Sequence, residues 1–122
     1  MVTADSTQIQ PETLARELVD VASERKASDI VLLDLRGVSI IADFFVICSG
    51  SSERQINALS QALVERADEM GVPTRRIEGS SASGWVLIDF LDVMVHIFAP
   101  EQRAFYKLDE LWKEAKPLLL IQ

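Results

Sequence analysis

The chain has 122 residues, a length that suits one domain with a substantial hydrophobic core. Hydrophobic residues make up 48% of it and charged residues 25%, and no apolar run approaches the roughly 20 residues of a membrane-spanning helix, so the composition predicts an ordinary globular protein. Twelve lysines and arginines against nineteen aspartates and glutamates give a net charge of −7, which argues against nucleic-acid binding and favours a basic protein partner. Solubility alone would also account for that charge.

The N-terminal part of the chain predicts a polar tail, a helix and a strand. Residues 1–10 are polar and lack the basic start and apolar centre of a signal peptide, so we expect a frayed tail. Pro11 suits the first turn of a helix, and apolar residues recur after it at helical spacing as far as about Lys26. Residues 30–35 then form an apolar run of strand length, which ends at a turn around Gly37.

The middle of the chain predicts a buried strand followed by a second helix. Residues 43–49 are apolar on both faces of a strand, which is typical of a strand in the centre of a sheet. Ser52 follows as a natural N-cap, and Gln55 three residues later completes the pattern of a capping box. The second helix continues at helical spacing to about Met70 and ends at Gly71.

The C-terminal third predicts three strands and a short helix. A short strand is expected over residues 75–78, and the small-residue loop 79–84 leads from it to two longer strands at residues 85–90 and 93–98. A short final helix is expected before Pro117, and it would carry Leu108, Leu111 and Trp112.

These elements follow one another in the order α-β-β-α-β-β-β-α. That order predicts a single α/β (α+β) domain over residues 11–116, with a mixed β-sheet of about five strands and helices packed on it. The apolar tail, residues 117–122, would either complete the core or pair with a second chain.

The two longer strands predict a hairpin with two chemically different faces. If Leu91 and Asp92 form its turn, residues 90 and 93 lie opposite each other, as do the pairs further from the turn. One face is wholly apolar and is the predicted core face; it carries Val86, Ile88, Phe90, Val93, Val95 and Ile97. The other face carries Trp85, Leu87, Asp89, Met94, His96 and Phe98. Two interpretations of this mixed face stay open: a helix covers it, or it is exposed and binds a protein, because interface centres favour aromatic residues and methionine.

The residue chemistry predicts no catalytic residue, no metal site and no cofactor. The one cysteine, Cys48, has apolar neighbours and is expected to be a buried structural thiol. Asp89, Asp92 and His96 are a weak metal-binding set, because structural zinc sites usually have four nitrogen or sulfur ligands. The turn at residues 49–52 is similar to one in nucleotidyltransferases, but the paired carboxylates that those enzymes carry soon after it are missing here. An enzyme of that kind is kept as an alternative.

One block of the sequence stands out, Asp43-Phe44-Phe45-Val46-Ile47-Cys48-Ser49-Gly50-Ser51-Ser52-Glu53-Arg54-Gln55. This block resembles the central motif of a known family, the Iojap proteins or ribosomal silencing factors (RsfS). Further family blocks follow in the same order at residues 78–79, 85–90, 92–93, 95–98 and 103–112, so the resemblance spans about residues 12–112. Two departures are slight, since Phe90 stands where tyrosine is common in the family and Leu91 where glycine is common.

The resemblance implies a non-catalytic cytoplasmic protein with a nucleotidyltransferase-like fold, often a homodimer when free. Such a factor binds the large ribosomal subunit through the basic ribosomal protein numbered fourteen and blocks association with the small subunit, which represses translation when nutrients are short. Relatives in organelles are linked to large-subunit assembly, which is a second alternative. No membrane partner and no sequence-specific nucleic-acid binding are expected.

Together, the mixed hairpin face and the family motif predict a set of partner-binding residues. Trp85 and its apolar neighbours would form the centre of the contact, and Asp89 would pair with a lysine or arginine of the partner. Tyr106 could equally be a core residue of the last helix. The predicted set is Trp85, Leu87, Asp89, Met94, His96, Phe98, Arg103 and Tyr106.

Overall fold

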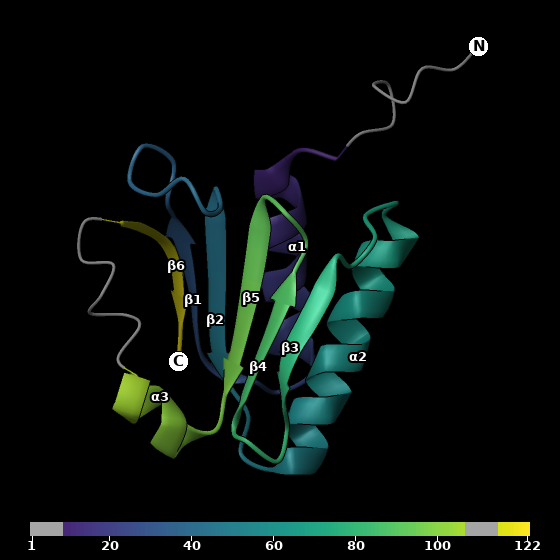
Figure 1. Cartoon of the computed structure of the whole chain (residues 1–122), viewed down its shortest axis with the longest axis vertical. Coiled ribbons are helices and arrows are strands. Elements are labelled where there is room, and N and C mark those ends of the chain that lie inside the picture. Colours follow the sequence, from purple (N-terminus) through teal and green to yellow (C-terminus); the bar gives the residue numbers. More distant parts are fainter. Residues whose placement is uncertain (1–8, 107–114) are drawn as a thin grey trace.

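The computed structural model describes residues 9–106 and 115–122, which form a six-stranded sheet with three helices (Figure 1). The predicted helix segment with Leu108, Leu111 and Trp112 lies outside the described residues, as does most of the predicted N-terminal tail. The described elements are α1 (Pro11–Glu24), β1 (Ser28–Asp34), β2 (Phe44–Ser49), α2 (Glu53–Glu69), β3 (Arg76–Ser80), β4 (Trp85–Asp89), β5 (Val93–Phe98), α3 (Pro100–Tyr106) and β6 (Lys116–Ile121). None of the described helices has the length and apolar character needed to span a membrane.

The sheet is mixed, as predicted, and its strand order is β3-β4-β5-β2-β1-β6. Strands β2 and β5 pair in parallel, and the other neighbouring strands pair antiparallel. The prediction of about five strands missed β6, which the apolar tail forms by pairing with β1 from Lys116 to Ile121. This pairing gives hydrogen-bond partners to the outer edge of β1, which would otherwise expose unpaired backbone groups.

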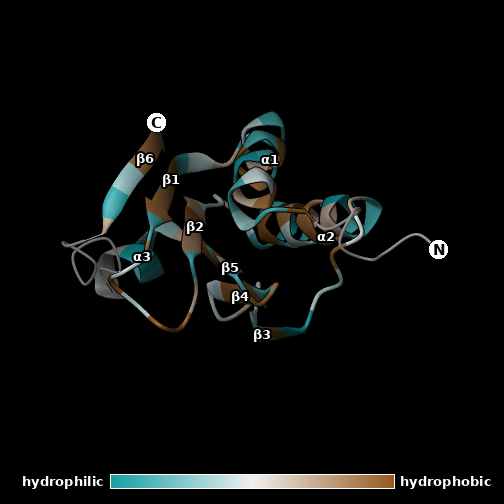
Figure 2. Ribbon diagram, turned by 90° about the horizontal axis from the view of Figure 1, so that it is seen from above, coloured by the Kyte–Doolittle hydropathy of each residue, from teal (hydrophilic) through white to brown (hydrophobic). Residues whose placement is uncertain are grey.

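Helices α1 and α2 pack on the same face of the sheet, and Figure 2 shows both on one side of the strands with α3 on the other. Their apolar stripes explain the placement, because each helix must bury that stripe against the sheet. The main core lies between these two helices and the strands, and β2 runs through the sheet with all six of its residues buried. The predicted central position of this strand is therefore confirmed.

Residue Ser52 caps α2 as predicted, but the return half of the capping box is different. The Ser52 side chain accepts a hydrogen bond from the backbone N–H of Gln55 at 3.1 Å. The side-chain oxygen of Gln55 accepts from the backbone of Ser51 at 2.6 Å rather than from that of Ser52. Its side-chain nitrogen donates to the carbonyl of Lys26 at 2.9 Å, so Gln55 also ties the start of α2 to the end of α1.

The hairpin of β4 and β5 has the predicted register, with Trp85 opposite Phe98 and Asp89 opposite Met94. The backbone N–H of Phe90 donates to the carbonyl of Val93 at 2.9 Å, which closes the two-residue turn over Leu91 and Asp92. All six residues of the predicted core face are buried in the main core, which confirms that assignment.

Candidate partner-binding surface

The face of the sheet away from α1 and α2 has a second buried cluster. It combines residues of β1, β2 and β5 with two from the segment between β1 and β2, and Trp85 and Leu87 of β4 pack against it. Its buried members are Val31, Leu33, Leu35, Ala42, Phe45, Ile47, Met94, Phe98 and Ala115. The mixed face of the hairpin is therefore one part of a wider apolar surface.

Aromatic rings in this cluster hold Trp85 in a defined orientation. The indole ring of Trp85 stacks on Phe98 with ring centroids 5.4 Å apart, and it lies nearly parallel to the imidazole of His96 at 6.0 Å. The Phe45 ring also packs against that imidazole, with ring centroids 4.6 Å apart and a tilt of 59°. The indole Nε1–H donates to Nδ1 of His96 at 3.2 Å, so both the plane and the edge of the indole are fixed.

The hydrogen bond from Trp85 determines the protonation state of His96. Because Nδ1 accepts a hydrogen bond, the imidazole is neutral and carries its proton on Nε2. Burial lowers the pKa of His96 to about 4, which also favours the neutral ring. The Nε2 atom is buried and has no hydrogen-bond partner in the part of the chain that the structure describes.

Protonation of His96 is expected to make the protein less stable in mild acid. Its pKa is about 4 in the folded chain and about 6.5 in the unfolded one, so the unfolded state binds the proton first as the pH falls. The contribution of His96 to the free energy of unfolding should be constant above about pH 7.5 and lower by about 2 kcal/mol at pH 5. Urea unfolding between pH 5 and pH 8 measures this change.

The His96→Gln variant, which cannot titrate there, is the control for that measurement. Since His96 is the only histidine in the chain, most of the dependence between pH 5.5 and pH 7.5 should disappear in the variant. Equal slopes for the two proteins would show that His96 does not titrate as its environment predicts.

The structure corrects the interpretation in which the mixed face of the hairpin is exposed, because only part of that face reaches the surface. Phe98 is completely buried, and only 5% of His96 and 8% of Met94 are exposed. Trp85 and Leu87 are partly exposed, and they are the members of the predicted apolar centre that can reach a partner. The alternation of residues along the strands correctly placed these side chains on one face, but packing by distant segments decides which of them reach the surface.

Asp89 also differs from its prediction, because it is buried and its carboxylate already has internal partners. One carboxylate oxygen accepts from the backbone N–H of Leu91 at 2.7 Å, and the other accepts from the guanidinium of Arg76 at 3.2 Å. Asp89 therefore stabilises the hairpin turn and the edge of β3. We do not include it in the proposed partner contact.

Residue Arg103, on α3, connects that helix to the ends of two strands. Its guanidinium donates to the backbone carbonyl of Asp29 at 2.6 Å and to the side-chain oxygen of Ser49 at 3.0 Å. These contacts give Arg103 a structural role, which is to hold α3 against the ends of β1 and β2. The backbone of Tyr106 ends α3, and its side chain lies outside the described part of the structure.

Strand β3 adds residues that the sequence did not indicate. A pocket of about 170 Å³ lies beside the two exposed members of the apolar face, and it is lined by Glu78, Gly79, Ser83, Trp85 and Leu87. Glu78 lies directly opposite Leu87 in the pairing of β3 with β4. The short strand predicted at residues 75–78 was the sequence feature that could have indicated that Glu78 lies next to the hairpin.

The turn between β2 and α2 has a structural explanation. A Cβ atom at Gly50 would meet the Ile56 side chain at 2.8 Å, so glycine is needed there for close packing of α2. Burial raises the pKa of the Cys48 thiol to about 12, which keeps it protonated and unreactive. Among the described residues, no group of three metal-ligating side chains comes together.

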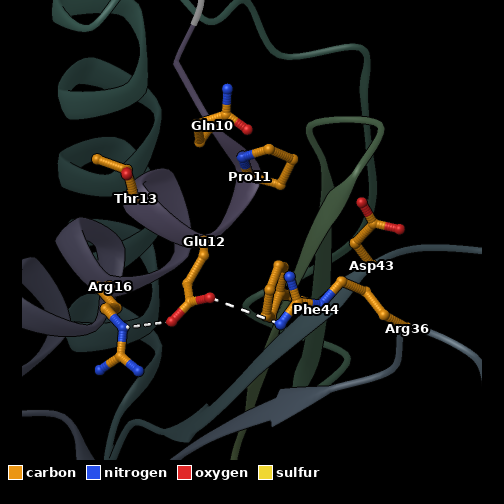
Figure 3. Close-up of a pocket in the computed structure, with 8 residues that line it drawn as sticks. All are labelled: Gln10, Pro11, Glu12, Thr13, Arg16, Arg36, Asp43 and Phe44. Carbon is orange, nitrogen blue, oxygen red and sulfur yellow. Dashed lines mark hydrogen bonds and ion pairs between the residues drawn. The ribbon is translucent and has the colours of Figure 1, made fainter.

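A surface pocket of about 470 Å³ lies at the start of α1, where Figure 3 shows Glu12 directed at both Arg16 and Arg36. Glu12 pairs with Arg16 at 3.0 Å and with Arg36 at 3.6 Å. The guanidinium of Arg36 also pairs with Asp34 at 2.7 Å and lies 4.8 Å from the centre of the Phe44 ring. These charges neutralise one another on the surface, which is the pattern of a structural ion-pair network.

The sequence is similar to those of proteins from a known family. The family model described as "Ribosomal silencing factor during starvation" (RsfS) matches residues 7–120. The chain belongs to the RsfS family. It is 42% identical over 104 residues to ribosomal silencing factor RsfS of Halalkalibacterium halodurans, covering 85% of this chain and 89% of that protein. It is 40% identical over 92 residues to RsfS of Bacillus subtilis, covering 75% and 78%.

The fold agrees with that assignment. A crystal structure of a Chromobacterium violaceum protein matches with a TM-score of 0.81 and 28% identity, over 85% of this chain and 87% of that one. RsfS proteins are ribosome-associated regulatory factors, and this member of the family is not an enzyme. The resemblance predicted from the motif at residues 43–55 is therefore confirmed, and the nucleotidyltransferase-like enzyme is set aside.

Proposed function

We propose that this RsfS protein binds the large ribosomal subunit through the exposed edge of Trp85 and Leu87 and prevents the small subunit from joining. The main support for the proposal is that the Trp85 side chain is partly exposed and yet fixed in orientation. Stacking on Phe98 and a hydrogen bond to His96 hold it in place. A rigid aromatic side chain loses little conformational freedom on binding and is typical of the residues that dominate interface energies.

The proposed partner is a basic ribosomal protein at the subunit interface, the large-subunit protein numbered fourteen. The net charge of −7 favours encounter with such a protein. The carboxylate of Glu78, at the rim of the pocket beside Trp85, would meet a lysine or arginine of the partner. Glu78 is more than half exposed and pairs with Arg76, which is itself exposed, so this ion pair can rearrange at little cost.

Blocking subunit association requires no chemistry. A contact of standard size, about 800 Å² on each partner, is enough to hold the protein on the joining surface, and the bulk of the domain then excludes the small subunit. This action would repress translation in the cytoplasm when nutrients are limited. We further propose that the free protein is a homodimer, which sedimentation equilibrium of the purified chain would establish.

Co-migration with isolated large subunits on a sucrose gradient tests the proposal. The protein is expected to sediment with large subunits, to be absent from the small-subunit fraction, and to slow subunit association as followed by light scattering. Joining at an unchanged rate, with the protein present in excess over large subunits, would contradict the proposed function. Depletion that leads to accumulation of large-subunit precursors, with normal joining of mature subunits, would favour the assembly alternative.

A further inference from the structure

The segment between β1 and β2 exposes an unusual number of apolar side chains. Ile40 is fully exposed, Ile41 is 58% exposed and Val38 is 39% exposed. Single exposed apolar residues are common on proteins, but three within four positions form a patch of the kind that marks interaction sites. In Figure 2 this segment is a brown arc on the side of the sheet away from α1 and α2.

Internal contacts hold this segment in shape. The backbone N–H of Leu35 donates to the carbonyl of Asp43 at 2.8 Å, which closes the base of the loop. Leu35 and Ala42 are buried in the second cluster, the same cluster against which Trp85 packs. The side-chain oxygen of Ser39 accepts from the backbone of Ile41 at 3.0 Å. The exposed side chains are thus presented on an ordered loop, which lowers the entropic cost of binding.

The turn of the β4–β5 hairpin lies next to this loop and adds a fourth apolar side chain. The backbone N–H of Asp43 donates to the carbonyl of Asp92 at 2.8 Å, and Leu91 beside it is 53% exposed. Both segments lie at the same end of the sheet, at the top of Figure 1. Leu91 has a φ of +83°, a strained conformation for a residue with a Cβ atom. Four of the six large apolar residues exposed in the described structure therefore gather at this end.

A cavity beside Leu91 makes this end suitable for anchoring a partner side chain. The cavity has a volume of about 550 Å³, and its apolar lining comes from Ile9, Pro11, Val72, Pro73, Phe90 and Leu91 itself. Arg75 and Asp92 are its charged residues. Exposed apolar side chains next to such a cavity are typical of the centre of a protein interface.

The charges at this end indicate which partner fits. Neither Asp43 nor Asp92 forms an ion pair with a described residue. Arg36 feels the charge of Asp43, but its ion pairs are with Glu12 and Asp34. Phosphates of nucleic acid or of a lipid surface would be repelled by these carboxylates and by the net charge of −7. A second copy of the chain in a two-fold contact would bring the same carboxylates together.

We propose that Val38, Ile40, Ile41 and Leu91 form a second docking surface for a basic protein surface on the large ribosomal subunit. The proposal rests on the proposed function, because the same subunit would be contacted at the Trp85 surface and at this end of the sheet. The loop is anchored in the cluster that supports Trp85, so the two surfaces keep a fixed spacing. Two linked contacts bind far more tightly than either alone.

Two variants test this surface without disturbing the fold. Ile40→Ser combined with Ile41→Ser removes the two most exposed apolar side chains of the loop, and Leu91→Gly removes the one on the hairpin turn while relieving the strained backbone. The matched control is Leu120→Ser, which removes a side chain that is 65% exposed on β6. Dissociation constants for isolated large subunits are measured for each protein and for Trp85→Ala, with thermal unfolding as the check of folding.

The double serine variant is expected to bind about tenfold more weakly and Leu91→Gly about fivefold more weakly, while Leu120→Ser stays within about twofold of the natural chain. Leu91→Gly should unfold at the same or a higher temperature, so its loss of affinity cannot come from unfolding.

If both variants bind like the natural chain while Trp85→Ala binds weakly, the proposal of a second surface is wrong and the proposed function stands. If the natural chain does not bind large subunits, both proposals fail. If the serine variant only converts a dimer to a monomer, the occupant is a second copy and the proposal is overturned.

Discussion

Replacing Trp85 with alanine is expected to weaken binding to isolated large ribosomal subunits by about 100-fold, the largest functional effect of any single substitution proposed here. The indole contributes partly exposed apolar area at the centre of the proposed contact, and its stacking on Phe98 fixes it in place before binding. Truncation to alanine removes both the contact area of the indole and the stacking that fixes its orientation. Equilibrium binding to large subunits, with fluorescently labelled protein, measures the loss.

Folding must be separated from binding in that experiment, because Trp85 also stabilises its own surroundings. Its removal takes away the hydrogen bond to His96, which costs on the order of 1 kcal/mol of stability but leaves the main core untouched. Ile77→Ala is the matched control: Ile77 is 50% exposed and lies opposite Ile88, on the other face of the same edge of the sheet. We expect this control to bind normally, and an equal loss in both variants would place the contact elsewhere.

The Trp85→Phe variant distinguishes the role of the ring from that of the indole N–H. A phenyl ring can still stack on Phe98 but cannot donate to His96. Intermediate affinity is expected, since part of the contact area and of the order is kept. Full affinity in Trp85→Phe would show that the hydrogen bond to His96 has no part in presenting the side chain.

Replacing Gly79 with alanine is expected to lower the free energy of unfolding by about 4 kcal/mol, the largest stability effect among the proposed substitutions. Gly79 lies on β3 with a φ of +79°, a region that costs alanine about 1 kcal/mol. A Cβ atom there would also lie 2.1 Å from the backbone carbonyl oxygen of Trp85, so β3 and β4 must separate. The same displacement would move Trp85, and binding to large subunits should fall with stability.

Gly71→Ala is the control that separates backbone strain from steric overlap. Gly71 follows α2 with a φ of +83°, but apart from its chain neighbours no described residue has a heavy atom within 4 Å of the position that its Cβ would take. The variant should therefore lose only about 1 kcal/mol. Urea unfolding of both variants measures the difference, and equal losses would mean that the β3–β4 pair accommodates the added methyl group without separating.

Local patterns in the sequence predicted helices α1 and α2, strands β1 to β5 and the faces of the hairpin. The spacing of apolar residues predicted α1 and α2, and alternation along residues 85–98 predicted both the core face and the register. Ser52 predicted the start of α2 because its side chain caps a helix only a few residues away. Each of these features depends on interactions between residues close in the chain, so the sequence by itself determined them.

Tertiary packing decided which residues of the mixed hairpin face reach the surface. Burial of Met94 and Phe98 depends on Phe45 and other residues far away in the chain, and the internal use of Asp89 depends on Arg76 from β3. Pairing of the apolar tail with β1 joins residues 82 to 91 positions apart. Exposure of Ile40 and Ile41 arises because Leu35 and Ala42 take the buried places of that loop. Alternation specifies which side chains share a face, but the contacts that cover a face come from distant parts of the chain, and only the folded structure brings them together.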